Sequence, residues 1–289
     1  MLDVSICIPS PNDTDLLEAT LLSLLENRPP QCEIVVVHAG HYDDPYQLAD
    51  EVRFVEHPSA TSSVELLNVG LSVCRGEVIH TLAPGCLASE GWLDQPRQLM
   101  SDSGVAMVAP HWQQAGSSKT TMGVQVERLG FRQDRVAGQA RQVLGPAMQA
   151  GFYRIAAAKA AGGWNPVFGP YADLDLALVL HAAGGVCQVA PESLITSEQS
   201  NEPRITPFEE AKLAKTVHAR HRRQIAGLVG PAGWSSLVGR AVCGLSGVQS
   251  LAGYLSAGTP ATEGPSVAAV KLALKQANLS EDFSDNRAA

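Results

Sequence analysis

Residues 80–94 read HTLAPGCLASEGWLD. The first residues belong to an apolar run that begins at Val78, and the last residues open a helical pattern near Trp92. A buried strand, a turn and a helix in this order form the repeating unit of an α/β protein. The stretch therefore predicts one unit of a parallel sheet covered by helices, and the sequence before it predicts the others.

The first hundred residues contain four short apolar runs separated by helical patterns. Near-continuous apolar strands are typical of a parallel sheet that is buried on both faces. The expected strands cover residues 4–8, 33–37, 52–56 and 78–82. Such sheets bind ligands beyond the carboxyl ends of their strands, so the loops at these ends should border one crevice. These loops are residues 9–12, 38–44 and 83–86.

The second half of the chain departs from this pattern. An antiparallel excursion is expected over residues 124–144, followed by strands at 147–153 and 186–190. Only helices are expected after about residue 203, so the predicted domains are an α/β domain over 1–202 and a helical extension over 203–289. The extension should hold helices over 209–229, 231–258 and 266–278, with a linker at 259–265.

The composition excludes several classes of protein. The chain has 289 residues, 45% of them hydrophobic, and a net charge of −8, which argues against a nucleic-acid partner because phosphates require a basic surface. Its six cysteines are scattered and are expected to be reduced core thiols. There is no secretory signal pattern, and no apolar run reaches the roughly 20 residues that span a bilayer, so a cytoplasmic protein is expected.

Four segments, in this order, resemble nucleotide-sugar-dependent family 2 glycosyltransferases with the GT-A fold. They are VSICIPSPN (4–12), CEIVVVHAGHYDD (32–44), ELLNVGLSVCRGEVIHTLAPGC (65–86) and AGGWNPVFGPYADLDLALVLHAAGGVCQVAPES (161–193). The resemblance covers about residues 3–200. It implies a mixed, mainly parallel sheet flanked by helices, and the transfer of a sugar from an activated donor to an acceptor.

The resemblance assigns donor binding to two loops and one helix. Pro9, Ser10 and Asn12 match the loop after the first strand, which lies near the nucleotide base in the family. His38 stands where the family has the first of two aspartates after the second strand, and Asn68 matches the Asn-x-Gly of a helix. The resemblance implies that these five residues contact the donor.

The acceptor side is assigned in the same way. Asp173 matches the aspartate that acts as general base in inverting members, where a carboxylate takes the proton of the attacking sugar hydroxyl. The alternative for Asp173 is a helix N-cap, and Asp175 is expected to cap the same helix. Trp164 could stack on an acceptor sugar, or it could pack against the sheet.

Several positions differ from the family pattern. The metal-binding aspartates of the Asp-x-Asp motif align with Ala83, Gly85 and Cys86, and the second aspartate after the second strand is Ala39. The arginine of the Asn-x-Gly helix is replaced by Leu67. The family's metal neutralises the departing diphosphate. No aspartate-held Mn²⁺ or Mg²⁺ is therefore expected as a cofactor.

Three replacements for the missing charge are open. Arg75 could approach the diphosphate, or it could belong to an exposed turn. The basic helix at 209–229 could cross the crevice, or it could present its charges to solvent. A different metal site is the third option, against ordinary surface or core histidines. Its candidate ligands are His38, His41, Asp43, Asp44, His80 and Cys86.

Two classes of function follow. The first is a glycosyltransferase that acts on a nucleotide sugar or another activated sugar, such as a lipid-phosphate sugar, with a saccharide or lipid acceptor and without an aspartate-held metal. The alternative is a catalytically inactive glycosyltransferase-like module that binds a carbohydrate, a nucleotide or a protein. Peripheral membrane contact through the basic helix is a further expectation.

Overall fold

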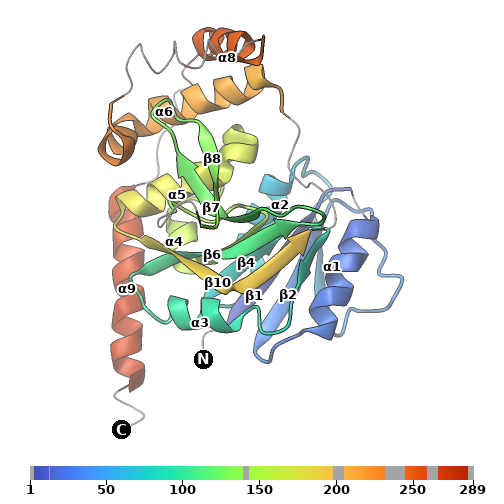
Figure 1. The fold of residues 1–289 in the computed structure, drawn as a ribbon. Helices are drawn as coiled ribbons and strands as arrows, with labels where there is room; N and C mark the ends of the chain where they lie inside the picture. The colour runs from blue at the N-terminus through green and yellow to red at the C-terminus, as the bar shows by residue number, and fades with distance from the viewer. Residues whose placement is uncertain are drawn as a thin grey trace.

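The computed structural model describes residues 3–12, 14–138, 143–197, 205–231, 245–258 and 266–285. Its central feature is a sheet with helices packed on both faces (Figure 1). The strands are β1 (Val4–Ser10), β2 (Cys32–His38), β3 (Val52–Glu56), β4 (Val78–Leu82), β5 (Cys86–Ala88), β6 (Val105–Gln114), β7 (Thr120–Val126), β8 (Arg132–Val136), β9 (Ala150–Arg154) and β10 (Val186–Ser197). The helices are α1 (Thr14–Glu26), α2 (Ser63–Val73), α3 (Asp94–Met100), α4 (Ile155–Ala160), the 3-10 helix η1 (Pro166–Tyr171), α5 (Ala172–Ala182), α6 (Pro207–Val229), α8 (Leu245–Ser256) and α9 (Val267–Asp285).

The strand order confirms the predicted α/β sheet. The order is β3-β2-β1-β4-β9-β6-β10-β5, and the first four strands pair in parallel. β9 runs antiparallel between β4 and β6, while β10 is parallel to β6. The expected antiparallel excursion is the β7–β8 hairpin. Because β1, β2, β4 and β10 point the same way, their carboxyl ends meet at one edge of the sheet.

One strand extends well beyond its predicted boundary, and one predicted helix is described only in part. The last strand continues to Ser197, well beyond residue 190, because its second half pairs with β6 and with the short strand β5. Within the predicted helix over 231–258, residues 245–256 are helical. Residues 232–244 and the predicted linker at 259–265 lie outside the described part of the chain.

Two apolar clusters form the core, one on each face of the sheet. In β1, Ile6 and Ile8 pack with α1 and α3, whereas Cys7 points to the opposite face, which α2, α4 and α5 cover. This alternation follows from the period of two in a strand. On the α2 side the packing is tight, because a Cβ at Gly70 would lie 2.2 Å from the Cys7 sulfur.

The C-terminal helices contact the rest of the protein through specific surfaces. A Cβ at Gly130, in the β7–β8 turn, would lie 2.2 Å from the carbonyl oxygen of Ala214 on α6, so the hairpin and the helix touch backbone to backbone. α9 packs beside α4 and α5 and buries Val270 and Leu274 (Figure 1). Within the described residues, none of the helices has both the length and the apolar character needed to cross a bilayer.

We expect Gly70→Ala to destabilise the protein by about 1–3 kcal/mol, because the added methyl group overlaps the buried Cys7 sulfur. The matched control is Gly227→Ala on α6, where nothing lies within 4 Å of the added Cβ. The control should gain about 0.5–1 kcal/mol from its higher helix propensity. Urea unfolding measures both changes, and equal effects of the two substitutions would contradict the packing described for α2 and β1.

His80 predicts a specific dependence of stability on pH. Its ring is fully buried, stacks on Phe152 with ring centroids 3.9 Å apart, and has Nδ1 3.1 Å from the Gly151 carbonyl oxygen. Burial lowers the pKa of His80 to about 3, although the hydrogen bond to Gly151 acts in the opposite direction. Between pH 6.5 and 3 the unfolded chain therefore binds a proton that the folded chain does not, and stability falls as the pH falls.

We expect His80→Phe to remove this contribution while it keeps an aromatic ring against Phe152. The free energy of unfolding of the wild type should fall more steeply between pH 6 and 4, by about 1.4 kcal/mol per pH unit relative to the variant. Urea titrations at several pH values measure the two slopes. Parallel slopes would show that His80 is not held neutral by the fold.

Candidate functional site

The carboxyl ends of the parallel strands bring three loops to one edge. Ser10 and His38 are neighbours at the ends of β1 and β2. At the end of β4, the Ala83 amide donates to the Gln149 carbonyl oxygen at 2.8 Å, which joins the loop at 83–86 to the residues before β9. The loops that the sequence predicts around one crevice thus border the same edge of the sheet.

Two histidines and two aromatic rings occupy the β1–β2 side of this edge. His41 Nε2 lies 3.3 Å from Ser10 Oγ, and Tyr42 stacks on Phe54 with ring centroids 5.3 Å apart. The Gly40 amide donates to His38 Nδ1 at 3.2 Å, so a neutral His38 carries its proton on Nε2. Burial and then the neighbouring His41 lower the pKa of His38, although Glu56 and Asp43 act in the opposite direction. A neutral imidazole therefore stands where the resemblance places a carboxylate.

The β1 loop itself presents little free polar surface. Pro9 and Ser10 are buried and Asn12 is exposed. Of the three, the Asn12 side chain is the one open to solvent at the end of β1. The structure thus places the predicted donor residues Pro9, Ser10, Asn12 and His38 at one corner of the edge.

The loop at 83–86 is a tight turn anchored on α1. Gly85 has φ +83°, and its amide donates to the Leu16 carbonyl oxygen at 2.9 Å and to Thr20 Oγ1 at 2.8 Å. The Cys86 amide closes the turn on the Ala83 carbonyl oxygen at 3.0 Å, and the Cys86 side chain is fully buried. A methyl group, a glycine and a buried thiol do not fit the Mn²⁺ or Mg²⁺ that the family uses, because both prefer oxygen ligands.

The alternative metal site is not assembled either. His80 lies in the core between Phe152 and Trp92, and Cys86 is buried beneath its turn, away from the exposed Asp43. Across the described parts of the chain, no three His, Cys, Asp or Glu side chains converge as metal ligands would. The sequence-based option of a histidine and cysteine site at this edge is therefore wrong for these six residues.

Asn68 binds the backbone of the segment that leads to η1. Its Nδ2 donates to the Trp164 carbonyl oxygen at 2.6 Å, and its Oδ1 accepts the Trp164 amide at 2.9 Å. Gly163 has φ +74°, and a Cβ there would lie 2.3 Å from Asn68 Oδ1, so the contact needs glycine. Both groups of the Asn68 amide are thus engaged within the fold, and the donor contact that the resemblance implies for Asn68 stays a prediction.

Trp164 is fully buried and meets Tyr153 edge to face, with ring centroids 5.1 Å apart. Its ring has no exposed face on which a sugar could stack. The structure therefore shows the packing alternative for Trp164. An acceptor contact would require this core tryptophan to leave its site.

Asp173 lies on the second residue of α5 with its side chain 1% exposed. Arg132 of β8 holds the carboxylate: its Nε is 3.1 Å from both Oδ1 and Oδ2, and its terminal nitrogen is 3.1 Å from Oδ2. The Met148 amide donates to Oδ2 at 3.2 Å. Since Gln149 follows Met148 and accepts the Ala83 amide, Asp173 sits beside the loop at 83–86.

The two helix-cap predictions are wrong. The N-cap of α5 is Tyr171, which makes no side-chain capping bond. Asp175, 2% exposed, points instead at α6, where His221 Nε2 lies 2.6 Å and Arg220 Nε 3.1 Å from its Oδ1. α6 is kinked at His221, which has φ −112°. Asp175 therefore ties α6 to the helix that carries Asp173.

Of the two open sources of positive charge, Arg75 and the basic helix, Arg75 lies away from the crevice. Arg75 follows α2 at the opposite edge of the sheet, where its amide donates to Glu33 Oε1 at 2.5 Å. On α6, Arg220 pairs with Asp175, and Lys215 donates to the Ala257 carbonyl oxygen at 2.6 Å. Arg75 therefore cannot neutralise a diphosphate at the carboxyl ends of the strands.

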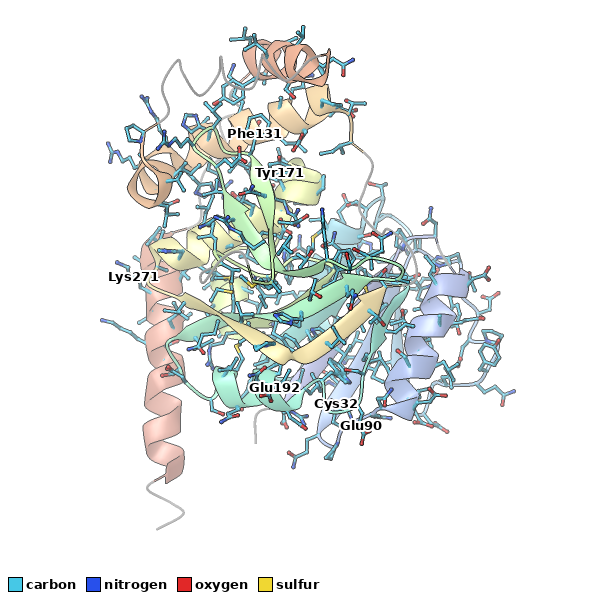
Figure 2. All side chains as sticks on the ribbon, in the orientation of Figure 1. Cys32, Glu90, Phe131, Tyr171, Glu192 and Lys271 are labelled. Carbon is cyan, nitrogen blue, oxygen red and sulfur yellow. The ribbon has the colours of Figure 1, made fainter. Side chains whose placement is uncertain are left out.

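Arg132 is the partner of Asp173 that the sequence did not predict. It comes from the β7–β8 hairpin and also binds Asp134 at 2.8 Å. Phe131, in the turn of the hairpin, stacks on Tyr254 of α8 and so supports the hairpin from the side of the C-terminal helices (Figure 2). Tyr171 of η1 donates to Glu210 of α6 at 3.2 Å. Arg132 is 41 residues from Asp173 in the sequence, so no local pattern could have paired them.

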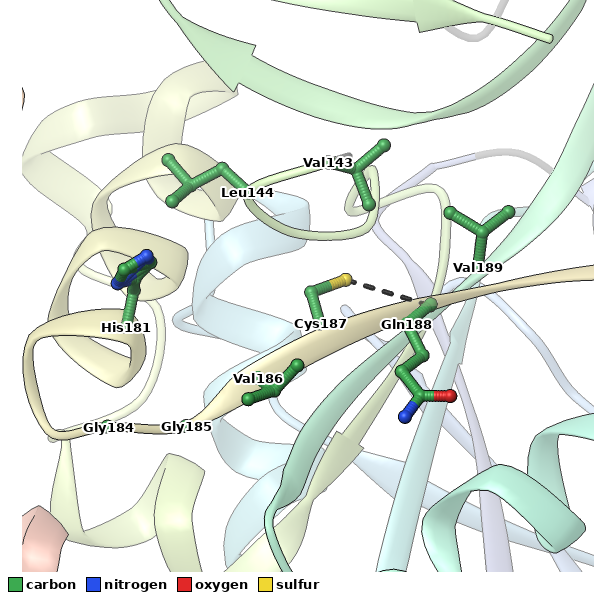
Figure 3. A pocket seen from close by; sticks show the side chains of 9 residues that line it. All are labelled: Val143, Leu144, His181, Gly184, Gly185, Val186, Cys187, Gln188 and Val189. Atoms are coloured by element: carbon green, nitrogen blue, oxygen red, sulfur yellow. Dashed lines mark hydrogen bonds between the residues drawn. The ribbon is translucent and has the colours of Figure 1, made fainter. Parts of the chain in front are cut away.

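A cavity of about 530 Å³ lies away from the crevice, between the end of α5, the start of β10 and residues 143–144 (Figure 3). It borders the start of β10, whose other end pairs Ser197 with Cys86 near the crevice. Burial raises the pKa of the Cys187 thiol in its wall, so this sulfur is not a thiolate at neutral pH. The lining residues are Val143, Leu144, His181, Gly184, Gly185, Val186, Cys187, Gln188 and Val189.

Solved structures with the same fold are glycosyltransferases. GalNAc-T7 with UDP, GalNAc and Mn²⁺ matches with a TM-score of 0.57 and 11% identity, over 77% of this chain and 51% of that chain. TarS from S. aureus has a TM-score of 0.57 and 13% identity, over 99% and 54%. The mannosyltransferase PcManGT from Pyrobaculum calidifontis, with GDP-Man and Mn²⁺, has a TM-score of 0.56 and 16% identity, over 96% and 80%.

These likenesses confirm the predicted GT-A-like fold. The chain spans about half the length of GalNAc-T7 and TarS. A comparison with curated protein sequences finds no match. The sequence model described as glycosyl transferase family 2 matches residues 5–158, which is more than half of the 289 residues. The chain belongs to glycosyl transferase family 2.

Proposed function

We propose that the protein transfers a sugar from a nucleoside-diphosphate sugar to a hydroxyl group of a saccharide or lipid acceptor, with Asp173 as general base. The observation that carries the proposal is the position of this carboxylate. It lies beside the loop at 83–86, at the carboxyl ends of the strands, where α/β sheets bind their ligands. Family membership supports a nucleotide-sugar donor, as do the similar structures in complex with UDP or GDP-Man.

The chemistry assigned to Asp173 is a proton transfer coupled to substitution. The acceptor oxygen forms a bond to the anomeric carbon while the bond from that carbon to the diphosphate breaks. The nucleoside diphosphate leaves with the electron pair, and Asp173 takes the hydroxyl proton. Arg132 donates to both carboxylate oxygens, and the Leu174 and Met148 amides each donate to one of them. One of these donors must therefore leave before an acceptor hydroxyl can donate to Asp173.

On the donor side we assign the base to the corner formed by Pro9, Ser10, Asn12 and His38. A neutral His38 offers an N–H donor at Nε2, whereas a carboxylate would offer only acceptors. The residues at 83–86 do not fit a divalent cation. The proposed transfer therefore takes place without an aspartate-held metal. Trp164 is left out of the assignment because its ring is fully buried within the fold. Asn68 stays a predicted donor residue whose amide also binds the Trp164 backbone.

We expect Asp173→Asn to lower turnover by roughly 10²–10⁴-fold, because an amide cannot take the hydroxyl proton. The measurement is release of UDP or GDP from a panel of UDP- and GDP-sugars, with water as acceptor. Asp175→Asn is the matched control, since it also removes a buried, ion-paired carboxylate two residues away on α5. Each substitution should cost about 3–5 kcal/mol of stability, so rates are compared where thermal melts show both variants folded.

The result that supports the proposal is a large loss in Asp173→Asn and little change in Asp175→Asn. Equal rates in Asp173→Asn and the wild type would contradict the role of Asp173. A wild type that releases no nucleotide from any donor of the panel would contradict nucleotide-sugar transfer, and would favour the inactive binding module.

A further inference from the structure

We propose that the outer face of α8, together with the cations of α6, docks on an anionic lipid bilayer. The α8 face consists of Val248, Ala252 and Leu255, which are spaced one and two helical turns apart. Val248 is 57% and Leu255 62% exposed, and Ala252 is exposed between them. An apolar stripe on the outside of a peripheral helix marks an interaction surface.

The opposite face of α8 is fixed on α6, so the exposed stripe has a defined direction. Tyr254 Oη lies 3.1 Å from His218 Nδ1, and Ser250 donates to the Pro207 carbonyl oxygen at 3.3 Å. A Cβ at Gly253 would lie 2.2 Å from the Phe208 carbonyl oxygen, so the two backbones are in contact. α8 lies on the far side of α6 from the sheet, at the periphery of the molecule (Figure 1).

The charge around this face is positive, although the whole chain has a net charge of −8. The described part of α8 carries no charged residue. Arg220 of α6 pairs with the buried Asp175, and the helix carries four further cations against two carboxylates. The four cations are Lys212, Lys215, Arg222 and Arg223. Lys215 reaches the end of α8, 3.4 Å from the Leu255 carbonyl oxygen. Arg222 and Arg223 are exposed.

The two carboxylates of α6 are engaged in other contacts. Glu209 accepts the Thr206 amide and hydroxyl in the capping box at the start of the helix, and Glu210 accepts the Tyr171 hydroxyl. An apolar stripe on a helix that packs against a basic helix, with Lys215 at its end, matches a surface of anionic headgroups over acyl chains. With only 12 residues, α8 would lie in the interface rather than cross it.

Charge argues against the other candidate occupant of this apolar face, which is a second copy of this chain. An isologous dimer through this face would place the cations of the two copies against each other. The exposed apolar surface on α1 gives a contrast within the same molecule. Leu22 is 61% exposed there, in a groove lined by Asp15 and Glu18, whose charges would repel anionic lipid.

The test is co-sedimentation of the full chain with vesicles of phosphatidylcholine alone, or of phosphatidylcholine with about one quarter phosphatidylglycerol. We expect binding to the mixed vesicles only. The pair of substitutions Val248→Glu and Leu255→Glu should lower the partition coefficient about tenfold or more. Leu22→Glu is the matched control, because Leu22 and Leu255 are equally exposed, and it should bind like the wild type. Arg222→Gln with Arg223→Gln should also lower binding about tenfold, without touching the stripe.

Four outcomes would overturn the proposal. They are no sedimentation of the wild type with either vesicle, equal binding to both vesicles, an equal loss in Leu22→Glu, or unchanged binding in both sets of α8 and α6 variants. Light scattering of the same proteins tests whether a second copy of this chain occupies the face instead. A wild-type dimer that Leu255→Glu converts to a monomer, without any vesicle binding, would assign the face to a second copy.

Discussion

Two buried carboxylates at the start of α5 organise the second half of the fold. Asp173 and Asp175 are 1% and 2% exposed and lie two residues apart. An unpaired charge in such a place costs several kcal/mol, so each carboxylate needs a partner from another element. Arg132 meets this need from the hairpin, and His221 with Arg220 meets it from α6. The pairing therefore fixes both the β7–β8 hairpin and α6 against α5.

The same constraint shapes the chemistry that the site can perform. Asp173 is held at the crevice by Arg132 and the Met148 amide, so its position is defined before any substrate arrives. On the donor side, hydrogen bonds to α1 hold the turn at 83–86 in place, but the turn carries no carboxylate. In the proposed function, Asp173 is the base on the acceptor side, and the nucleotide is recognised through neutral groups such as His38.

The sequence predicted those parts of the fold that depend on short-range patterns. Continuous apolar runs gave β1, β2, β3 and β4, and the loops after them do meet at one edge. Gly70 and Asn68 were singled out by a motif, and the structure shows what each does in packing: Gly70 admits the Cys7 sulfur, and Asn68 binds the Trp164 backbone. Whether Asn68 also contacts a donor remains a prediction.

The parts that the sequence did not predict depend on partners far apart along the chain. Arg132 is 41 residues from Asp173, and His221 is 46 residues from Asp175. An aspartate near the start of a helix suggests a cap, because capping needs only local geometry. Here burial made a distant cation the better partner, and burial also keeps His80 neutral in the core, which is one of the two ordinary alternatives to a metal ligand.

The central claim is that this family 2 chain binds a nucleoside diphosphate at the crevice edge without a carboxylate-held metal. Calorimetric titration of UDP and of GDP, each in EDTA and in excess Mn²⁺, tests it most directly. We expect at least one of the two nucleotides to bind with the same affinity under both conditions, because Ala83, Gly85 and Cys86 provide no oxygen side-chain ligands. Binding that appears only with Mn²⁺, or no binding of either nucleotide, would contradict the claim.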